Sequence, residues 1–182
     1  MNLIASKSQL RASFARWALL FVPLILLLGS LSGQLGSSDT AWFAGLRKPE
    51  IFPPSAVFGI AWSVLFVLIG LALAFVASAW GAHGRRLALG VFALHFIGTL
   101  AWTPVFFGLQ EMRIALWVLV YVVVSLFVVV LLFGRVRKVA ALLLLPYLGW
   151  VAFASVLNYE FIIANPAGGE TRQAQAAVRA AL

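Results

Sequence analysis

Cysteine is absent from this 182-residue sequence, and acidic residues are scarce. The absence of cysteine excludes disulfides and thiolate metal sites. Only five Asp and Glu residues stand against thirteen Lys and Arg, and the acidic residues fall between apolar runs, at their ends or in the C-terminal tail. The sequence also lacks a Walker loop, a dinucleotide fingerprint, an HExxH motif and a nucleophile elbow. These absences argue against ATP-driven transport, nicotinamide chemistry and zinc or serine hydrolysis.

Apolar residues are what the sequence has in excess. They make up 64% of the chain, charged residues make up 10%, and the mean hydropathy is +1.07. A soluble domain is about 45–50% apolar and about 25% charged, so the polar residues here cannot cover a globule in water. The net charge of +8 sits in short clusters between apolar runs and leaves no continuous basic face for nucleic acid. The composition predicts a membrane protein.

Five apolar runs are long enough to cross a bilayer, which takes about 20 residues each. Continuous runs without alternating polarity form helices, because lipid cannot satisfy backbone hydrogen bonds. We therefore predict an all-α membrane protein with five transmembrane helices in an antiparallel bundle. Residues 1–165 are expected to form this single domain and residues 166–182 a disordered tail. The predicted spans are residues 17–36, 55–80, 87–107, 114–133 and 139–159.

The basic residues predict the orientation of the bundle. With the N-terminus in the cytoplasm, the inner segments carry eight Lys and Arg near the spans and the outer loops carry three. Such an excess marks the cytoplasmic side. An all-helical bundle with a basic leader is expected in the bacterial inner membrane, and an outer-membrane placement stays open. We expect the first span to remain in the protein rather than to be cleaved as a signal peptide.

Small and polar residues within the spans raise separate questions. Gly29 and Gly33 form a GxxxG pattern, which favours close helix packing and leaves a homodimer open. His95, Thr99 and Trp102 share one helical face in the third span. His95 either faces a ligand, even as a ligand of a metalloporphyrin, or is a neutral histidine hydrogen-bonded to a neighbouring helix. No metal site of the protein's own is predicted.

Tryptophans near prolines predict an aromatic cavity. Trp62, Trp102 and Trp150 lie inside apolar runs, and Pro53, Pro54, Pro104 and Pro146 interrupt the helix surfaces nearby. Aromatic side chains around such interruptions are suited to hold a flat apolar ligand.

Three ordered segments carry a family resemblance. They are AGLRKPEIFPPSAVFGIAWSVLF (44–66), TLAWTPVFFG (99–108) and PYLGWVAFASVLNYE (146–160). The chain resembles the TspO/MBR family of tryptophan-rich sensory and translocator proteins, also called the peripheral-type benzodiazepine receptor family. It departs from the usual family pattern at Thr99, where Asn is common, at His95, where Gln is common, and at Phe43 and Phe66, where Tyr is common.

The resemblance implies a five-helix protein, commonly dimeric, whose first loop closes a cavity for porphyrins such as protoporphyrin IX or haem and for other flat apolar molecules. It implies that porphyrin is a ligand and that no cofactor is required. Together with His95 and Thr99, the ligand-binding residues are then expected to be Phe43, Pro53, Trp62, Phe66, Trp102, Trp150 and Ala154.

Four functions remain open at this level. The first is a porphyrin-binding membrane protein that regulates tetrapyrrole level or transport, which needs no catalytic group. The alternative is an enzyme that degrades porphyrin in light, with Trp62 and Trp150 as the redox-active candidates for catalytic residues. A passive transporter and a scaffold that only packs against other proteins are the remaining two.

Overall fold

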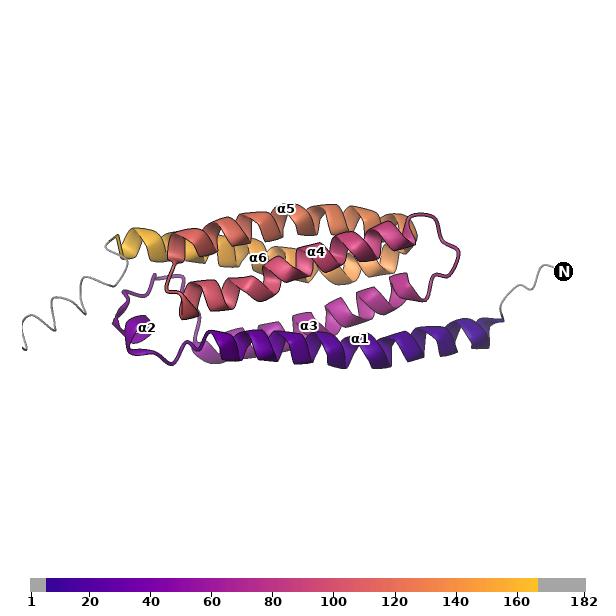
Figure 1. Ribbon diagram of the computed structural model, residues 1–182, viewed down its shortest axis with the longest axis horizontal. Coiled ribbons are helices and arrows are strands. Elements are labelled where there is room, and N and C mark those ends of the chain that lie inside the picture. The colour runs from indigo at the N-terminus through magenta and orange to yellow at the C-terminus, as the bar shows by residue number, and fades with distance from the viewer. Residues whose placement is uncertain (1–5, 167–182) are drawn as a thin grey trace, which may run out of the picture.

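The computed structural model describes residues 6–166, and these form a bundle of long helices without strands (Figure 1). Five of the helices are long and apolar enough to cross a membrane. This confirms the predicted all-α fold. The elements in chain order are α1 (Lys7–Leu35), α2 (Ala41–Gly45), α3 (Ser55–Ala77), α4 (Arg85–Thr103), the π-helical turn η1 (Pro104–Gly108), α5 (Met112–Val136) and α6 (Lys138–Ala164).

The bundle has two distinct ends. The short helix α2 lies at one end beside the C-terminal end of α6, and we call this the α2 end (Figure 1). The start of α1 and the connection between α3 and α4 lie at the opposite end. The basic residues that predict a cytoplasmic side fall at that opposite end. The orientation of the bundle in a membrane stays a prediction.

The helices differ from the predicted spans mainly at their ends. Helix α1 begins ten residues before the predicted span, because Ser6 and Gln9 form a capping box: the Ser6 hydroxyl accepts from the Gln9 amide, and the Gln9 side chain accepts from the Ser6 amide. Helix α3 ends at Ala77 rather than at residue 80. Residues 167–182 of the predicted tail lie outside the described residues.

Helices α1 and α3 approach each other closely at two glycines. A β-carbon at Gly70 of α3 would lie 2.7 Å from the Cα of Val22 in α1, and one at Gly29 of α1 would lie 2.1 Å from the ring of Phe66. Gly33, the second glycine of the GxxxG pattern, has no atom within 4 Å of such a β-carbon. The pattern therefore packs α1 against α3 at Gly29 and leaves open space at Gly33.

The end of α4 turns into a wider helix at Pro104. Proline has no amide hydrogen, and the amide of Leu109 reaches back to the carbonyl of Pro104 at 2.8 Å, which is π-helical spacing. The turn brings Phe106 and Phe107 to the α2 end of the bundle. Phe106 is buried there, and its ring stacks on that of Trp102 at 5.4 Å.

Candidate functional site

A cavity of about 440 Å³ lies at the α2-proximal half of the bundle, between α1, α3, the end of α4 and α6. Helices α1 and α3 form one side of the cavity, from Gly29 toward the α2 end. The loop that contains α2 contributes Phe43 and Phe52. We call it the main cavity. Its other lining residues are Leu26, Gly29, Ser30, Ser32, Gly33, Gly36, Ser37, Ser38, Ser55, Phe58, Gly59, Trp62, Ser63, Phe66, Thr99, Leu100, Trp102, Thr103, Phe106, Phe107, Ala154, Leu157, Asn158 and Phe161.

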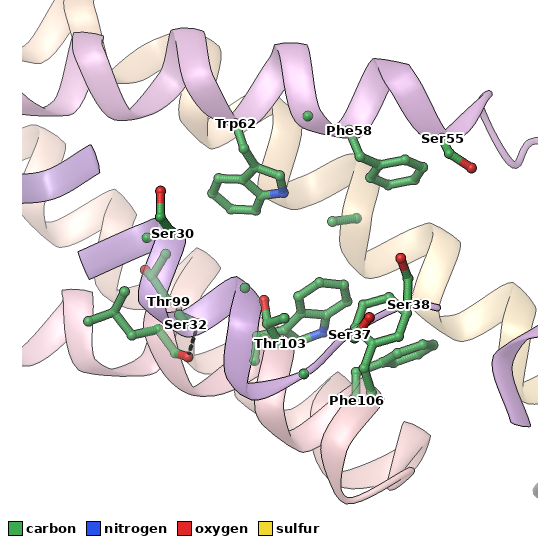
Figure 2. A pocket seen from close by; sticks show the side chains of 18 of the residues that line it. Ser30, Ser32, Ser37, Ser38, Ser55, Phe58, Trp62, Thr99, Thr103 and Phe106 are labelled. Carbon is green, nitrogen blue, oxygen red and sulfur yellow. Dashed lines mark hydrogen bonds between the residues drawn. The ribbon is translucent and has the colours of Figure 1, made fainter. Parts of the chain in front are cut away.

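Aromatic rings line two opposite walls of the main cavity. Figure 2 shows Trp62 and Phe58 on α3 pointing toward Thr103 and Phe106 on the other side. The ring of Trp62 also contacts Phe66 at 5.2 Å. Two aromatic walls with space between them suit a flat apolar molecule, because ring faces make large apolar contacts.

Hydroxyl groups form the polar part of the wall. Ser30, Ser37 and Ser38 belong to the end of α1 and the residues after it, and Ser55 and Ser63 belong to α3. All five are exposed, so they mark the rim where the main cavity opens between these two segments. Deeper in the wall, the Ser32 hydroxyl donates to the Leu100 carbonyl at 2.6 Å and ties α1 to α4 (Figure 2).

The loop between α1 and α3 forms a lid at the α2 end. Trp42 is 3% exposed and packs edge-on against Phe106 at 5.8 Å. Phe43 packs against Phe107 at 5.0 Å, and the Lys48 ammonium lies 3.7 Å from the centre of the Phe43 ring. The same ammonium donates to the carbonyl oxygen of Phe43, and desolvation lowers the pKa of Lys48. The lid therefore places a lysine directly behind an aromatic wall residue.

Asn165 clamps the lid to the end of α6. Its Oδ1 accepts from the Arg47 amide at 2.8 Å, and its Nδ2 donates to the Arg47 carbonyl at 3.0 Å. The side chain thus copies the paired hydrogen bonds of a neighbouring backbone segment. Nδ2 also donates to the Phe161 carbonyl, which fixes the amide on the helix.

Removing this clamp is expected to loosen the lid. Two hydrogen bonds contribute about 0.5–1.5 kcal/mol each, so Asn165→Ala should raise amide exchange in residues 41–54 by about tenfold. Hydrogen–deuterium exchange followed by mass spectrometry measures this. Asn165→Asp keeps the acceptor for Arg47 and should give a smaller increase; equal exchange in the native and alanine proteins would contradict the clamp.

The structure brings most of the predicted ligand-binding residues together. Six line the main cavity: Phe43, Trp62, Phe66, Thr99, Trp102 and Ala154. Pro53 and Trp150 instead line a second cavity of about 520 Å³ on the outer side of α3 and α6, which we call the outer groove. Phe58 stands between the two spaces, because it lines the main cavity and packs edge-on against Trp150 at 5.8 Å.

His95 lies outside both cavities and is fully buried. Its Nδ1 lies 2.8 Å from the Ser125 hydroxyl and its Nε2 lies 3.1 Å from the Tyr147 hydroxyl. The sequence left open whether His95 faces a ligand or is hydrogen-bonded to a neighbouring helix, and the structure shows the second arrangement. Both ring nitrogens are engaged, and the ring does not reach the main cavity as an iron ligand would.

The sequence did not single out Asn158, Phe58 or Phe106. Asn158 is 1% exposed, accepts from the Trp102 indole at 3.2 Å and donates to the Met112 carbonyl at 2.9 Å. It thereby fixes the Trp102 ring in the cavity wall. An amide inside an apolar run is itself a signal of function or packing, and it was available in the sequence.

No group of three His, Cys, Asp or Glu side chains within residues 6–166 is placed to hold a metal ion. Every buried side-chain nitrogen and oxygen in this part of the chain has a hydrogen-bond partner. The main cavity offers ring faces, hydroxyls and one amide, a set suited to binding a flat apolar molecule.

Comparison with known proteins identifies the family. The model of the TspO/MBR family matches residues 21–163. The tryptophan-rich protein TspO of Chlorobaculum tepidum is 34% identical over 81% of this chain and 94% of its own length. The protein CrtK of Rhodobacter capsulatus is 35% identical over 71% of this chain and 81% of its own, and the human translocator protein is 35% identical over 65% and 71%.

The matched range begins in α1 and ends in α6, so it contains all the residues described above as lining the main cavity. The resemblance inferred from the three sequence segments is thereby confirmed. With five apolar helices long enough to span a bilayer, the chain is a multi-pass membrane protein that belongs to the TspO/MBR family.

Proposed function

We propose that this protein binds porphyrins in the main cavity and regulates tetrapyrrole level or transport. The observation that carries the proposal is the pair of aromatic walls, with Trp62 on α3 and Trp102 with Phe106 across the cavity. Indole and phenyl faces stack on a planar macrocycle, and a space of about 440 Å³ falls within the range of about 300–1,000 Å³ for small-molecule sites. Porphyrin is the ligand here and no resident cofactor is required.

The charge of the lid supports the same ligand class. Protoporphyrin IX carries two carboxylates on one edge of an apolar ring. Lys48 lies behind Phe43 and is not one of the lining residues, so a macrocycle with its carboxylate edge toward the α2 end has a cation beyond the Phe43 ring. The apolar edge then points toward Gly29 and Phe66, where α1 and α3 close together.

The relatives' names, sensory protein and translocator protein, support a regulatory or transport role. The sequence has no nucleotide-binding motif, which argues against ATP-driven pumping and leaves passive movement of the ligand open. We infer a cytoplasmic N-terminus from the charge bias of the loops, and we infer the bacterial inner membrane because the protein is an all-helical bundle with a basic leader. A homodimer is part of the proposal on family resemblance alone.

Light-dependent porphyrin breakdown is the second candidate, and Trp62 favours it. Trp62 lines the main cavity, where its indole can donate an electron to an excited macrocycle. Trp150 faces the outer groove and meets the main cavity only through the ring of Phe58. We therefore assign the redox role to Trp62 ahead of Trp150.

The test is a dark titration of the detergent-purified protein with protoporphyrin IX, followed by the porphyrin absorption band. Native protein should bind saturably. Trp62→Leu should weaken binding by about tenfold, because an aromatic contact worth about 1.4 kcal/mol is lost. Trp150→Leu makes the same change in the outer groove and should leave affinity within about twofold of the native value, the scatter expected of a residue away from the ligand.

Three results would contradict the proposal. Binding that never saturates would indicate partitioning into the detergent. Saturable binding weakened by Trp150→Leu but not by Trp62→Leu would move the site to the outer groove. Equal affinity in all three proteins would mean that neither Trp62 nor Trp150 contacts the porphyrin.

A further inference from the structure

A continuous row of polar side chains crosses the bundle behind the main cavity. Thr99, on the cavity wall, lies 2.6 Å from the hydroxyl of Tyr147, and Tyr147 lies 3.1 Å from Nε2 of His95. Nδ1 of His95 then meets Ser125 at 2.8 Å. Tyr147 and His95 are both 0% exposed, and ligand binding as described above uses neither of them.

The backbone carbonyls beside Ser125 favour one direction for these hydrogen bonds. The Ser125 hydroxyl lies 2.7 Å from the Tyr121 carbonyl and 3.2 Å from the Val122 carbonyl, and both carbonyls can only accept. When the hydroxyl donates its single proton to them, Ser125 accepts from His95, which then carries its proton on Nδ1 and leaves Nε2 as an acceptor. In this tautomer the other hydrogen bonds of the row follow. The hydroxyl of Tyr147 is the nearest donor to Nε2, since Thr99 lies farther away at 3.5 Å. Tyr147 donates to His95, and Thr99 donates to Tyr147.

The same tyrosine contacts Trp62, the tryptophan to which the light-dependent proposal gives the redox role. The rings of Trp62 and Tyr147 meet edge to face with centres 6.2 Å apart. Trp62 lines the main cavity and Tyr147 does not, so Tyr147 lies on the side of Trp62 that faces away from the cavity. A molecule in the cavity, Trp62, Tyr147 and His95 thus stand in contact in that order.

We propose that Tyr147 and His95 form a proton-coupled relay that reduces Trp62 after Trp62 has given an electron to an oxidant in the main cavity. The oxidant is a photoexcited porphyrin, which becomes its radical anion and passes the electron to dioxygen. The Trp62 radical cation takes one electron from Tyr147. The phenolic O–H bond breaks, its proton moves to Nε2 of His95, and the products are neutral Trp62, a neutral tyrosyl radical and an imidazolium.

The position of His95 is what makes this relay specific. A phenol that loses an electron must also lose its proton, and the proton needs an acceptor already in place, because Tyr147 is 0% exposed and out of contact with bulk solvent. Nε2 of His95 is that acceptor, and Ser125 holds the opposite side of the ring. A packing role alone would require neither an acceptor nitrogen facing the phenol of Tyr147 nor the contact between Tyr147 and Trp62.

The experiment uses a protein in which Tyr147 is the only tyrosine. The sequence has three tyrosines, and Tyr121 and Tyr159 are exposed, so Tyr121→Phe with Tyr159→Phe isolates the buried one. Pulse radiolysis with azide radicals oxidises tryptophan in the dark without porphyrin. We expect the tryptophanyl absorption to decay as tyrosyl absorption grows at the same rate. Trp62→Phe in this background should abolish the growth, whereas Trp80→Phe, at a residue 68% exposed, should leave it.

The role of His95 is tested in the same background. His95→Gln keeps a hydrogen-bond acceptor but no basic nitrogen, and should slow tyrosyl formation by about a hundredfold, the usual contribution of a positioned proton acceptor. Circular dichroism and thermal unfolding check that the variant is folded. Unchanged kinetics in a folded His95→Gln protein would overturn the relay, as would tryptophanyl decay without any tyrosyl signal in the parent.

The relay rests on the light-dependent form of the proposed function. Its test, however, requires neither light nor porphyrin. Azide radicals replace the porphyrin, so a failure of porphyrin binding leaves the radical kinetics measurable. Conversely, a protein that binds porphyrin and shows no electron transfer from Tyr147 to Trp62 would keep the binding proposal and end the relay.

Discussion

Filling the main cavity from Gly59 is expected to weaken porphyrin binding by about a hundredfold. Gly59 lines the cavity from α3, and a β-carbon there has no atom within 4 Å, so the Gly59→Leu side chain can enter the open space without displacing the protein. The ligand and the new leucine side chain then compete for the same space. The crowding costs about 3 kcal/mol of binding free energy, which corresponds to the hundredfold change. The dark titration with protoporphyrin IX measures it. Gly33→Leu enters the same cavity from α1 and should act alike.

Gly149→Leu is the matched control for these two variants. Gly149 lines the outer groove on α6 and also has no atom within 4 Å of an added β-carbon. The substitution is the same and the helix position is equally open, so a general effect of leucine on the fold would appear in all three proteins. Native-like affinity in Gly59→Leu, or an equal loss in Gly149→Leu, would show that the main cavity is not the porphyrin site.

A second large effect is expected at the crossing of α1 and α3. Gly70→Val should lower the free energy of unfolding by about 3 kcal/mol, because its β-carbon would lie 2.7 Å from the backbone of Val22 and the helices must separate. Thermal unfolding in one detergent measures the change. The expected result is a lower unfolding temperature together with weaker porphyrin binding, since the same two helices line the main cavity.

Gly90→Val provides the comparison for Gly70→Val. Gly90 lies on the exposed face of α4 with open space around its β-carbon position. Both variants place the same β-branched residue in a helix, so the difference between them isolates the helix contact from helix propensity. Equal stabilities for the two variants would mean that α1 and α3 are not held together at Gly70.

The helices could be predicted from the sequence because lipid leaves few alternatives. An apolar run of about 20 residues has to form a helix to satisfy its backbone, and five runs with short connections have to form an antiparallel bundle. Ser6 and Gln9 also have the spacing of a capping box, but the predicted span was set by hydropathy alone and began ten residues after the start of α1. Helix α2 has five residues and no long apolar run, so hydropathy did not reveal it.

The cavity walls were predicted less completely, because the direction of a side chain depends on more than its helical face. Trp150 and Ala154 are one turn apart on α6, yet Ala154 lines the main cavity and Trp150 the outer groove. A long side chain on a helix leans toward the N-terminus, which carries the Trp150 ring toward Pro146 and away from the cavity. The partners of His95 come from α5 and α6, and no pattern within the third span specifies them.

The central claim is that the space between Trp62 and Trp102 holds a porphyrin, and the position of a bound metalloporphyrin tests it most directly. Crystals grown with zinc protoporphyrin IX give an anomalous signal from the zinc alone. We predict one zinc peak inside the main cavity, between the α3 wall of Trp62 and the α4 wall of Trp102. A peak in the outer groove beside Trp150, or no ordered peak in a saturated crystal, would contradict the claim.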